Sequence, residues 1–140
     1  MLNPEHLLTS YEISDLPKGP WLVFAPHADD ETYGMGGSLL RARDENVDTH
    51  IVILTDGALG GESDDLIYVR RKEVQQAAAM LNASSLQLWE EPDRGLSLRQ
   101  ELVSRIVKTI EETAPASVFL PGPMELHPDH RAASALVWEG

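Results

Sequence analysis

Two short clusters of histidine and aspartate hold the side chains of this sequence that are best suited to chemistry. They are His27, Asp29 and Asp30 in PHADDE, and His127, Asp129 and His130 in HPDH. Zinc is bound in proteins by thiolate, imidazole or carboxylate groups, and this chain has no cysteine. A metal site here must therefore be built from histidine, aspartate or glutamate.

The first cluster and one residue of the second can supply the ligands of a catalytic metal site. Catalytic zinc usually has three protein ligands and one water. His27 and Asp30 are three positions apart and can bind one ion together, and His130 can complete the set. The metal lowers the pKa of its water to about 7. Asp29, between the first two ligands, is placed to act as the general base.

The other residues of the second cluster can act on the leaving group. An imidazolium at His127 would stabilise an oxyanion and pass a proton to a departing amine, and Asp129 would orient and charge it. Metal, water, base and acid together predict hydrolysis of an amide. Without a metal, the same residues would form a solvated acidic turn and, at Asp129, a helix cap.

The hydrophobic pattern of the chain alternates between strands and helices four times. Short apolar or β-branched runs predict strands, and amphipathic runs predict helices. The predicted strands are 21–26, 50–55, 85–90 and 116–121. The predicted helices are 35–46, 66–82, 102–110 and a last helix from His127. The third of these helices follows a capping-box pattern at Ser97 and Gln100.

This alternation predicts an α/β fold, a Rossmann-like three-layer α/β/α domain with a mainly parallel sheet. In the commonest doubly wound order, about 3-2-1-4 here, the first and fourth strands lie side by side, and ligands bind in the crevice at their carboxyl ends. PHADDE follows the first strand and HPDH follows the fourth. We therefore expect the two clusters to face each other across this crevice.

Length and charge restrict the protein to a few classes. A chain of 140 residues suits one domain, here 21–140 after an irregular lead-in over 1–20. The net charge of −12 argues against nucleic acid and anionic membranes as partners. The sequence shows no signal peptide and no apolar run of membrane-spanning length. These features favour a soluble, cytoplasmic protein that acts on a small molecule.

Both clusters stand in motifs of a known family. PHADDE is similar to the A/P-H-P-D-D-E motif of the LmbE-like, or PIG-L, zinc N-deacetylases, and HPDH matches their H-x-D-H motif. Between them, TDGALGGE (55–62) resembles the family's T-x-G-x-x-G loop. RRKEVQQAAAMLN resembles its R-x-x-E helix, which places Arg70 and Glu73. The resemblance extends over about residues 20–135.

The resemblance implies an enzyme with one zinc ion per chain that removes an acetyl or larger acyl group from an amino sugar, such as a conjugate of N-acetylglucosamine. It also implies roles for particular residues. The implied zinc ligands are His27, Asp30 and His130, the base is Asp29, the pair facing the tetrahedral intermediate is His127 with Asp129, and the substrate contacts are Arg70 and, in PDRGL, Asp93.

The end of the chain departs from the family pattern. Family members continue for roughly another hundred residues, more than half a typical domain, whereas this chain ends ten residues after His130. We therefore expect a C-terminally truncated domain in which the fourth strand is an exposed apolar edge. Because proteins usually cover such an edge, a homo-oligomer is a further expectation.

Two other functions remain open on the sequence alone. A magnesium-dependent phosphoryl-transfer or receiver-like domain would use Asp29 and Asp30 to hold the ion, and Asp56 partly fits this scheme. That alternative leaves HPDH unexplained, and no lysine follows the fourth strand. The other alternative is a non-catalytic, truncated domain that keeps the metal site for stability or for binding a partner.

Overall fold

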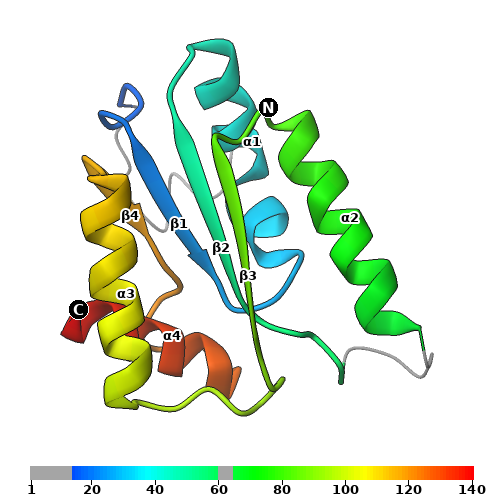
Figure 1. Cartoon of the computed structure of the whole chain (residues 1–140). Helices are drawn as coiled ribbons and strands as arrows, with labels where there is room; N and C mark the ends of the chain where they lie inside the picture. Colours follow the sequence, from blue (N-terminus) through cyan, green and yellow to red (C-terminus); the bar gives the residue numbers. More distant parts are fainter. Residues whose placement is uncertain (1–13, 60–64) are drawn as a thin grey trace, which may run out of the picture.

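The computed structural model of the chain describes residues 14–59 and 65–140. Most of the predicted lead-in, and the loop residues from Gly60 to Asp64, lie outside these ranges. In the described part, strands and helices alternate along the chain (Figure 1). The elements are β1 (Trp21–Ala25), α1 (Asp30–Asp44), β2 (Thr49–Thr55), α2 (Leu66–Met80), β3 (Ser85–Glu91), α3 (Gln100–Thr113), β4 (Ser117–Phe119) and α4 (Pro128–Glu139).

The four strands form one sheet in the order β3-β2-β1-β4. Every neighbouring pair is parallel, and Trp21 of β1 pairs with Thr49 on one side and with Ser117 on the other. The predicted Rossmann-like α/β fold with strand order 3-2-1-4 is thus confirmed. In a receiver-like fold β1 lies between β2 and β3, whereas here it lies between β2 and β4. The topology therefore speaks against the receiver-like alternative.

Helices cover both faces of the sheet and give it two apolar cores. Figure 1 shows α1 and α2 on one face and α3 and α4 on the other. Trp21 and Val23 of β1 pack into the core that contains Leu39 of α1, while Leu22 and Phe24 pack into the core on the opposite face. All residues of β1 are buried. This central strand is thus held from both sides, and the loop at its carboxyl end starts from a fixed point.

The first helix begins earlier than the sequence predicts. α1 starts at Asp30, five residues before the predicted start at Met35. The backbone of Met35 leaves the helical region (φ −148°, ψ 21°) and divides the helix into a first turn and a longer regular part. Glycines around this break lower the helix propensity, so the sequence pattern does not predict the first turn. Asp30 is therefore held by a helical turn.

The predicted capping box of the third helix is wrong. The N-cap residue of α3 is Arg99 in an extended conformation (φ −120°, ψ 138°), and it makes no side-chain capping bond. Ser97 is exposed and lies two residues before this cap. The amphipathic pattern is confirmed, since Leu102 and Ile106 are buried against the sheet. The S-x-x-Q spacing alone does not determine the helix start, because the extended chain at Arg99 moves it towards the C-terminus.

The fourth strand lies at the edge of the sheet, as predicted. β4 pairs only with β1 among the described strands, and Val118 and Leu120 are 36% and 37% exposed. A hollow of about 490 Å³ beside it is lined by the end of β1, the start of α1 and Phe119. Among the described helices, none combines the length and the apolar character needed to cross a membrane.

Candidate metal centre

A tight turn after β1 brings the first two candidate ligands together. The backbone amides of Asp29 and Asp30 both donate to the carbonyl of His27, at 3.0 and 3.3 Å. In return, Oδ2 of Asp30 accepts the backbone N–H of His27 at 2.9 Å and lies 3.2 Å from Nδ1 of its ring. The pair is therefore arranged by local structure, as their spacing in the sequence predicts.

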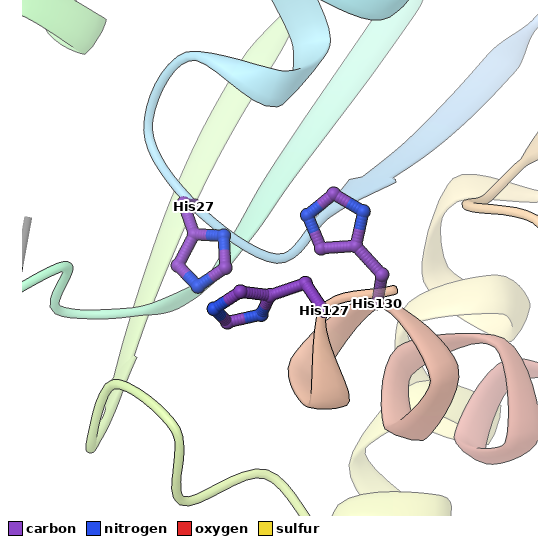
Figure 2. Close-up of side chains that lie close together, drawn as sticks. All are labelled: His27, His127 and His130. Atoms are coloured by element: carbon purple, nitrogen blue, oxygen red, sulfur yellow. The ribbon is translucent and has the colours of Figure 1, made fainter. Parts of the chain in front are cut away.

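The start of α4 brings two more imidazoles to the same place. His127 is the N-cap residue, in an extended conformation, and Pro128 opens the helix, a position that proline favours. The cap is therefore His127 and not Asp129. Nε2 of His130 lies 3.2 Å from Oδ2 of Asp30. Figure 2 shows the rings of His27, His127 and His130 gathered together, with centroids 4.7 to 5.5 Å apart.

The donor set fits a metal ion. In a tetrahedral zinc site with bonds of about 2.0–2.1 Å, neighbouring ligand atoms are about 3.3 Å apart. The 3.2 Å contacts of Asp30 Oδ2 with Nδ1 of His27 and with Nε2 of His130 match this separation. One ring nitrogen from each of His27, His127 and His130 also lies within 4.8 Å of the other two. This part of the chain therefore offers a His/Asp group that could hold a metal ion.

The carboxylate of Asp129 contacts a different histidine from the one predicted. Oδ2 of Asp129 lies 3.2 Å from Nε2 of His27, whereas His127 is joined to Asp129 through the backbone N–H, which donates to Nδ1 at 3.3 Å. The Asp129 side chain is fully buried. Its oxygens also accept the backbone N–H groups of Arg94 at 2.7 Å and Leu96 at 3.2 Å. The carboxylate is thus fixed and orients the ring of His27.

The electrostatics of the cluster favour an ion pair between His27 and Asp30. Burial alone would lower the pKa of His27, but its hydrogen bond to Asp30 and the charges of Asp30 and Asp93 outweigh this effect, so the pKa lies above 6.5. Burial alone would raise the pKa of Asp30. Hydrogen bonds from His27 and the charge of His130 outweigh it, so this pKa lies below its ordinary value. A metal bound here would compete with the proton on His27.

A hollow of about 290 Å³ collects most of the predicted site residues. Its lining includes His27, Asp29, Asp30, Arg70, Asp93 and His127. His130 and Asp30 line the larger hollow beside β4, so Asp30 stands between the two spaces. Asp129 lies buried behind His27. The structure thus brings together predicted site residues from four segments of the chain. Asp29 makes no capping bond at the start of α1.

Asp56 and Gly57, in the loop after β2, shape this site. They were not assigned to it from the sequence. Oδ1 of Asp56 accepts the backbone N–H groups of Ala58 at 3.0 Å and Asp93 at 3.1 Å. Gly57 has φ +65°, and a Cβ there would lie 3.0 Å from Nη1 of Arg70. The Asp-Gly pair after β2 is a turn signal, and it could have indicated that Asp56 accepts hydrogen bonds from loop N–H groups. The contact of Gly57 with Arg70 could not be predicted in this way, because it depends on how α2 packs against the loop.

Replacing Asp129 by asparagine is expected to weaken zinc binding by about 10- to 100-fold, because the partner that orients a ligating histidine is lost. An asparagine amide also presents N–H donors to the N–H groups of Arg94 and Leu96, so some stability will be lost. Competition titration with a zinc chelator measures the affinity. Ala133→Gly, a buried change in α4 costing about 1 kcal/mol, is the matched control and should keep the affinity.

The wild-type protein provides a second readout of the same contact. In ¹⁵N-histidine spectra of the zinc-loaded protein, His27 should show a proton on Nε2, where Asp129 accepts it, and the metal on Nδ1. A metal-bound Nε2 on His27 would contradict the proposed orientation, whatever the asparagine variant does.

Glu31 is a buried acid that gives a pH-dependent prediction. Its side chain is 3% exposed. Oε1 accepts the Thr32 hydroxyl at 2.8 Å, while Oε2 has no hydrogen-bond partner among the described residues. Burial, with a smaller effect from the charge of Asp29, raises the pKa of Glu31 above 4.5. The free energy of unfolding should therefore fall as the pH rises from 4.5 through the raised pKa.

Glu31→Gln removes this charge and should stabilise the metal-free protein by about 1 kcal/mol at pH 7.5, with little effect at pH 4. Urea unfolding at the two pH values measures the difference. Glu45→Gln, at the exposed end of α1, is the control and should show no such pH dependence. An equal effect of Glu31→Gln at both pH values would contradict the assignment.

The fold and the site define an α/β protein with a His/Asp centre at the carboxyl ends of β1 and β4. The model of the family described as PIG-L, GlcNAc-PI de-N-acetylase, matches residues 22–140. The chain belongs to this family.

Curated relatives and a solved structure agree with this assignment. The chain is 32% identical over 123 residues to diacetylchitobiose deacetylase of Thermococcus kodakarensis, covering 82% of this chain and 46% of the relative. It is 33% identical over 130 residues to the probable N-acetyl-alpha-D-glucosaminyl L-malate deacetylase 2 of Bacillus anthracis, covering 84% and 57%. The N,N'-diacetylchitobiose deacetylase of Pyrococcus horikoshii superposes with a TM-score of 0.80 at 31% identity, covering 85% and 48%. The chain therefore spans about half the length of these relatives.

Proposed function

We propose that this chain carries the zinc centre of a deacetylase that hydrolyses the N-acetyl amide of an amino sugar or its conjugate. The observation that carries the proposal is the position of Asp30, whose Oδ2 lies 3.2 Å from Nδ1 of His27 and 3.2 Å from Nε2 of His130. Membership of the family and the names of the relatives, which are deacetylases of N-acetylated sugars, support the choice of reaction.

The residues divide the chemistry among them. His27, Asp30 and His130 would hold one zinc ion, which supplies a water of lowered pKa and polarises the amide carbonyl. Asp29 lines the hollow beside these ligands and would take the proton of the attacking water. His127, as an imidazolium, would stabilise the oxyanion and return a proton to the departing amine.

The hollow gives the substrate a place next to these groups. Its volume of about 290 Å³ is at the lower end of the usual range for small-molecule sites, roughly 300–1,000 Å³, and suits one sugar ring. Asp93 and Arg70 line it. Oδ2 of Asp93 accepts the N–H of Leu59 at 3.0 Å, so this carboxylate is positioned to accept a sugar hydroxyl. Arg70 would contact the same substrate.

A second candidate is a non-catalytic metal-binding domain. A second hollow of about 490 Å³ beside β4 is lined by Asp30 and His130, so these two predicted ligands also face a space outside the smaller hollow. One experiment separates the two functions. Metal content is measured by elemental mass spectrometry, and acetate release is then assayed on a panel of N-acetylated amino sugars. About one zinc per chain with acetate release supports the deacetylase. One zinc without acetate release from any substrate supports the binding domain and rejects the enzyme for this chain.

A further inference from the structure

The end of β2 holds a buried threonine that bonds to the turn carrying the first candidate ligand. Thr55 is 5% exposed. Its hydroxyl donates to the carbonyl oxygen of Pro26 at 2.8 Å, and its backbone N–H donates to the same oxygen at 2.9 Å. A carbonyl oxygen has two lone pairs, and Thr55 supplies a donor for each. The chain directly before His27 is therefore joined to the neighbouring strand.

The carbonyl of Pro26 and the N–H of His27 belong to one peptide group. This N–H donates to Oδ2 of Asp30 at 2.9 Å, and the same oxygen lies 3.2 Å from Nδ1 of His27 and 3.2 Å from Nε2 of His130. Because a peptide group is planar, a fixed carbonyl also fixes the direction of the N–H. A hydrogen bond to the carbonyl polarises the group and strengthens the N–H as a donor. One peptide group thus connects Thr55 to the oxygen that faces both imidazoles.

The position of Thr55 is itself set by two strands, since β2 lies between β3 and β1. Thr55 pairs with Glu91 of β3, and the next residue, Asp56, donates its N–H to the carbonyl of Glu91 at 2.8 Å. A buried hydroxyl that donates to a carbonyl is not unusual by itself, and Thr109 does so to Arg105 at 2.9 Å. That bond lies inside α3, which supplies none of the candidate site residues. What distinguishes Thr55 is the peptide group to which it bonds.

We propose that Thr55 is a positioning residue for the metal centre: its hydroxyl, acting through the peptide group of Pro26 and His27, places the carboxylate of Asp30 for the metal. This inference rests on the proposed function, in which Asp30 is a ligand. Partners that orient a metal ligand directly are worth about 10- to 100-fold in affinity. Thr55 acts through one intervening group, so a smaller contribution of about three- to tenfold is expected.

The test measures zinc affinity by chelator competition in variants of the full chain. Thr55→Val keeps the shape of the side chain but removes the hydroxyl, and it should weaken zinc binding by about three- to tenfold. Thr55→Ser keeps the hydroxyl and should retain nearly the wild-type affinity. Thr109→Val, which removes an equally buried hydroxyl from α3, is the matched control and should bind zinc as the wild type does. Thr55→Ala compared with Thr55→Ser gives the same contrast if the valine variant does not fold.

A spectroscopic measurement on the metal-free protein follows the connection itself. In ¹H–¹⁵N correlation spectra, the amide proton of His27 should move upfield in Thr55→Val, because its peptide group loses the polarisation by the hydroxyl. It should keep its position in Thr55→Ser and in Thr109→Val. This readout depends on neither zinc nor substrate.

Several outcomes would overturn the inference. If Thr55→Val binds zinc as tightly as the wild type, if Thr55→Ser is as weak as Thr55→Val, or if the amide proton of His27 does not move, Thr55 does not position the ligand and the deacetylase proposal stands. An equal loss of affinity in Thr109→Val would indicate a general loosening of the fold and would also reject the inference. If the wild-type chain binds no zinc, the proposed metal centre and the role of Thr55 are both contradicted.

Discussion

Replacing Asp30 by alanine is expected to reduce the zinc content of the purified protein from about one ion per chain to nearly none. Asp30 is the residue whose carboxylate meets both His27 and His130 at 3.2 Å. A structural zinc site with four ligands is worth about 10–16 kcal/mol, so one ligand contributes roughly 3–4 kcal/mol. The affinity should therefore fall by about two to three orders of magnitude, measured by elemental analysis and chelator competition.

A matched control separates this effect from a general change of charge. Asp44→Ala removes a carboxylate from the other end of α1, where it pairs with Arg43 at the surface, and should leave the zinc content unchanged. A different ligand set would be indicated if Asp30→Ala kept its zinc. One ring nitrogen from each of His27, His127 and His130 lies within 4.8 Å of the other two. Loss of zinc in His127→Ala, with retention in Asp30→Ala, would then assign the metal to the three imidazoles.

Replacing Asp29 by asparagine is expected to reduce kcat for acetate release by about 10²- to 10⁴-fold, the usual contribution of a general base. Zinc content should not change, because the predicted ligands flank this residue and do not include it. Asparagine has nearly the same size as aspartate but takes up no proton near neutral pH. The measurement is a steady-state assay on any substrate from which the wild-type chain releases acetate, combined with metal analysis of the same samples.

The matched control for Asp29 is Asp93→Asn in the same hollow. Asp93 is proposed to bind a sugar hydroxyl, so its loss should raise KM by about tenfold while kcat changes less. If the Asp29 variant keeps more than a tenth of the wild-type kcat, Asp29 is not the base. A large loss of zinc in the same variant would instead assign Asp29 to the metal.

The hydrophobic pattern of the sequence was sufficient to predict the fold. The apolar run over 21–26 and the β-branched run over 50–55 each bury both faces, and amphipathic helices must lie between them. Parallel strands with helical connections admit few arrangements, and the observed order β3-β2-β1-β4 is the predicted one. The local spacing of His27 and Asp30 likewise determined their contact, because a tight turn joins residues three positions apart.

The meeting of the two motifs also followed from the sequence, though indirectly. The carboxyl ends of neighbouring parallel strands lie at one edge of a sheet, so two clusters that follow such strands must approach each other. What this rule does not determine is how individual side chains pair at the edge. Of the predicted residues, Asp30 lies at 3.2 Å from both His27 and His130, whereas the carboxylate of Asp129 contacts His27 and not the ring of His127 that was predicted.

Tertiary structure alone decided the features that depend on loops distant in the sequence. The carboxylate of Asp129 is directed by the N–H groups of Arg94 and Leu96, 35 and 33 positions away, and by His27, 102 positions away. No local pattern encodes these contacts, because they arise only when β3, α4 and the turn after β1 have packed. For the same reason, the sequence shows which arginines are present, but only the packed loops show that Arg70 and Arg94 line the hollow beside the metal centre.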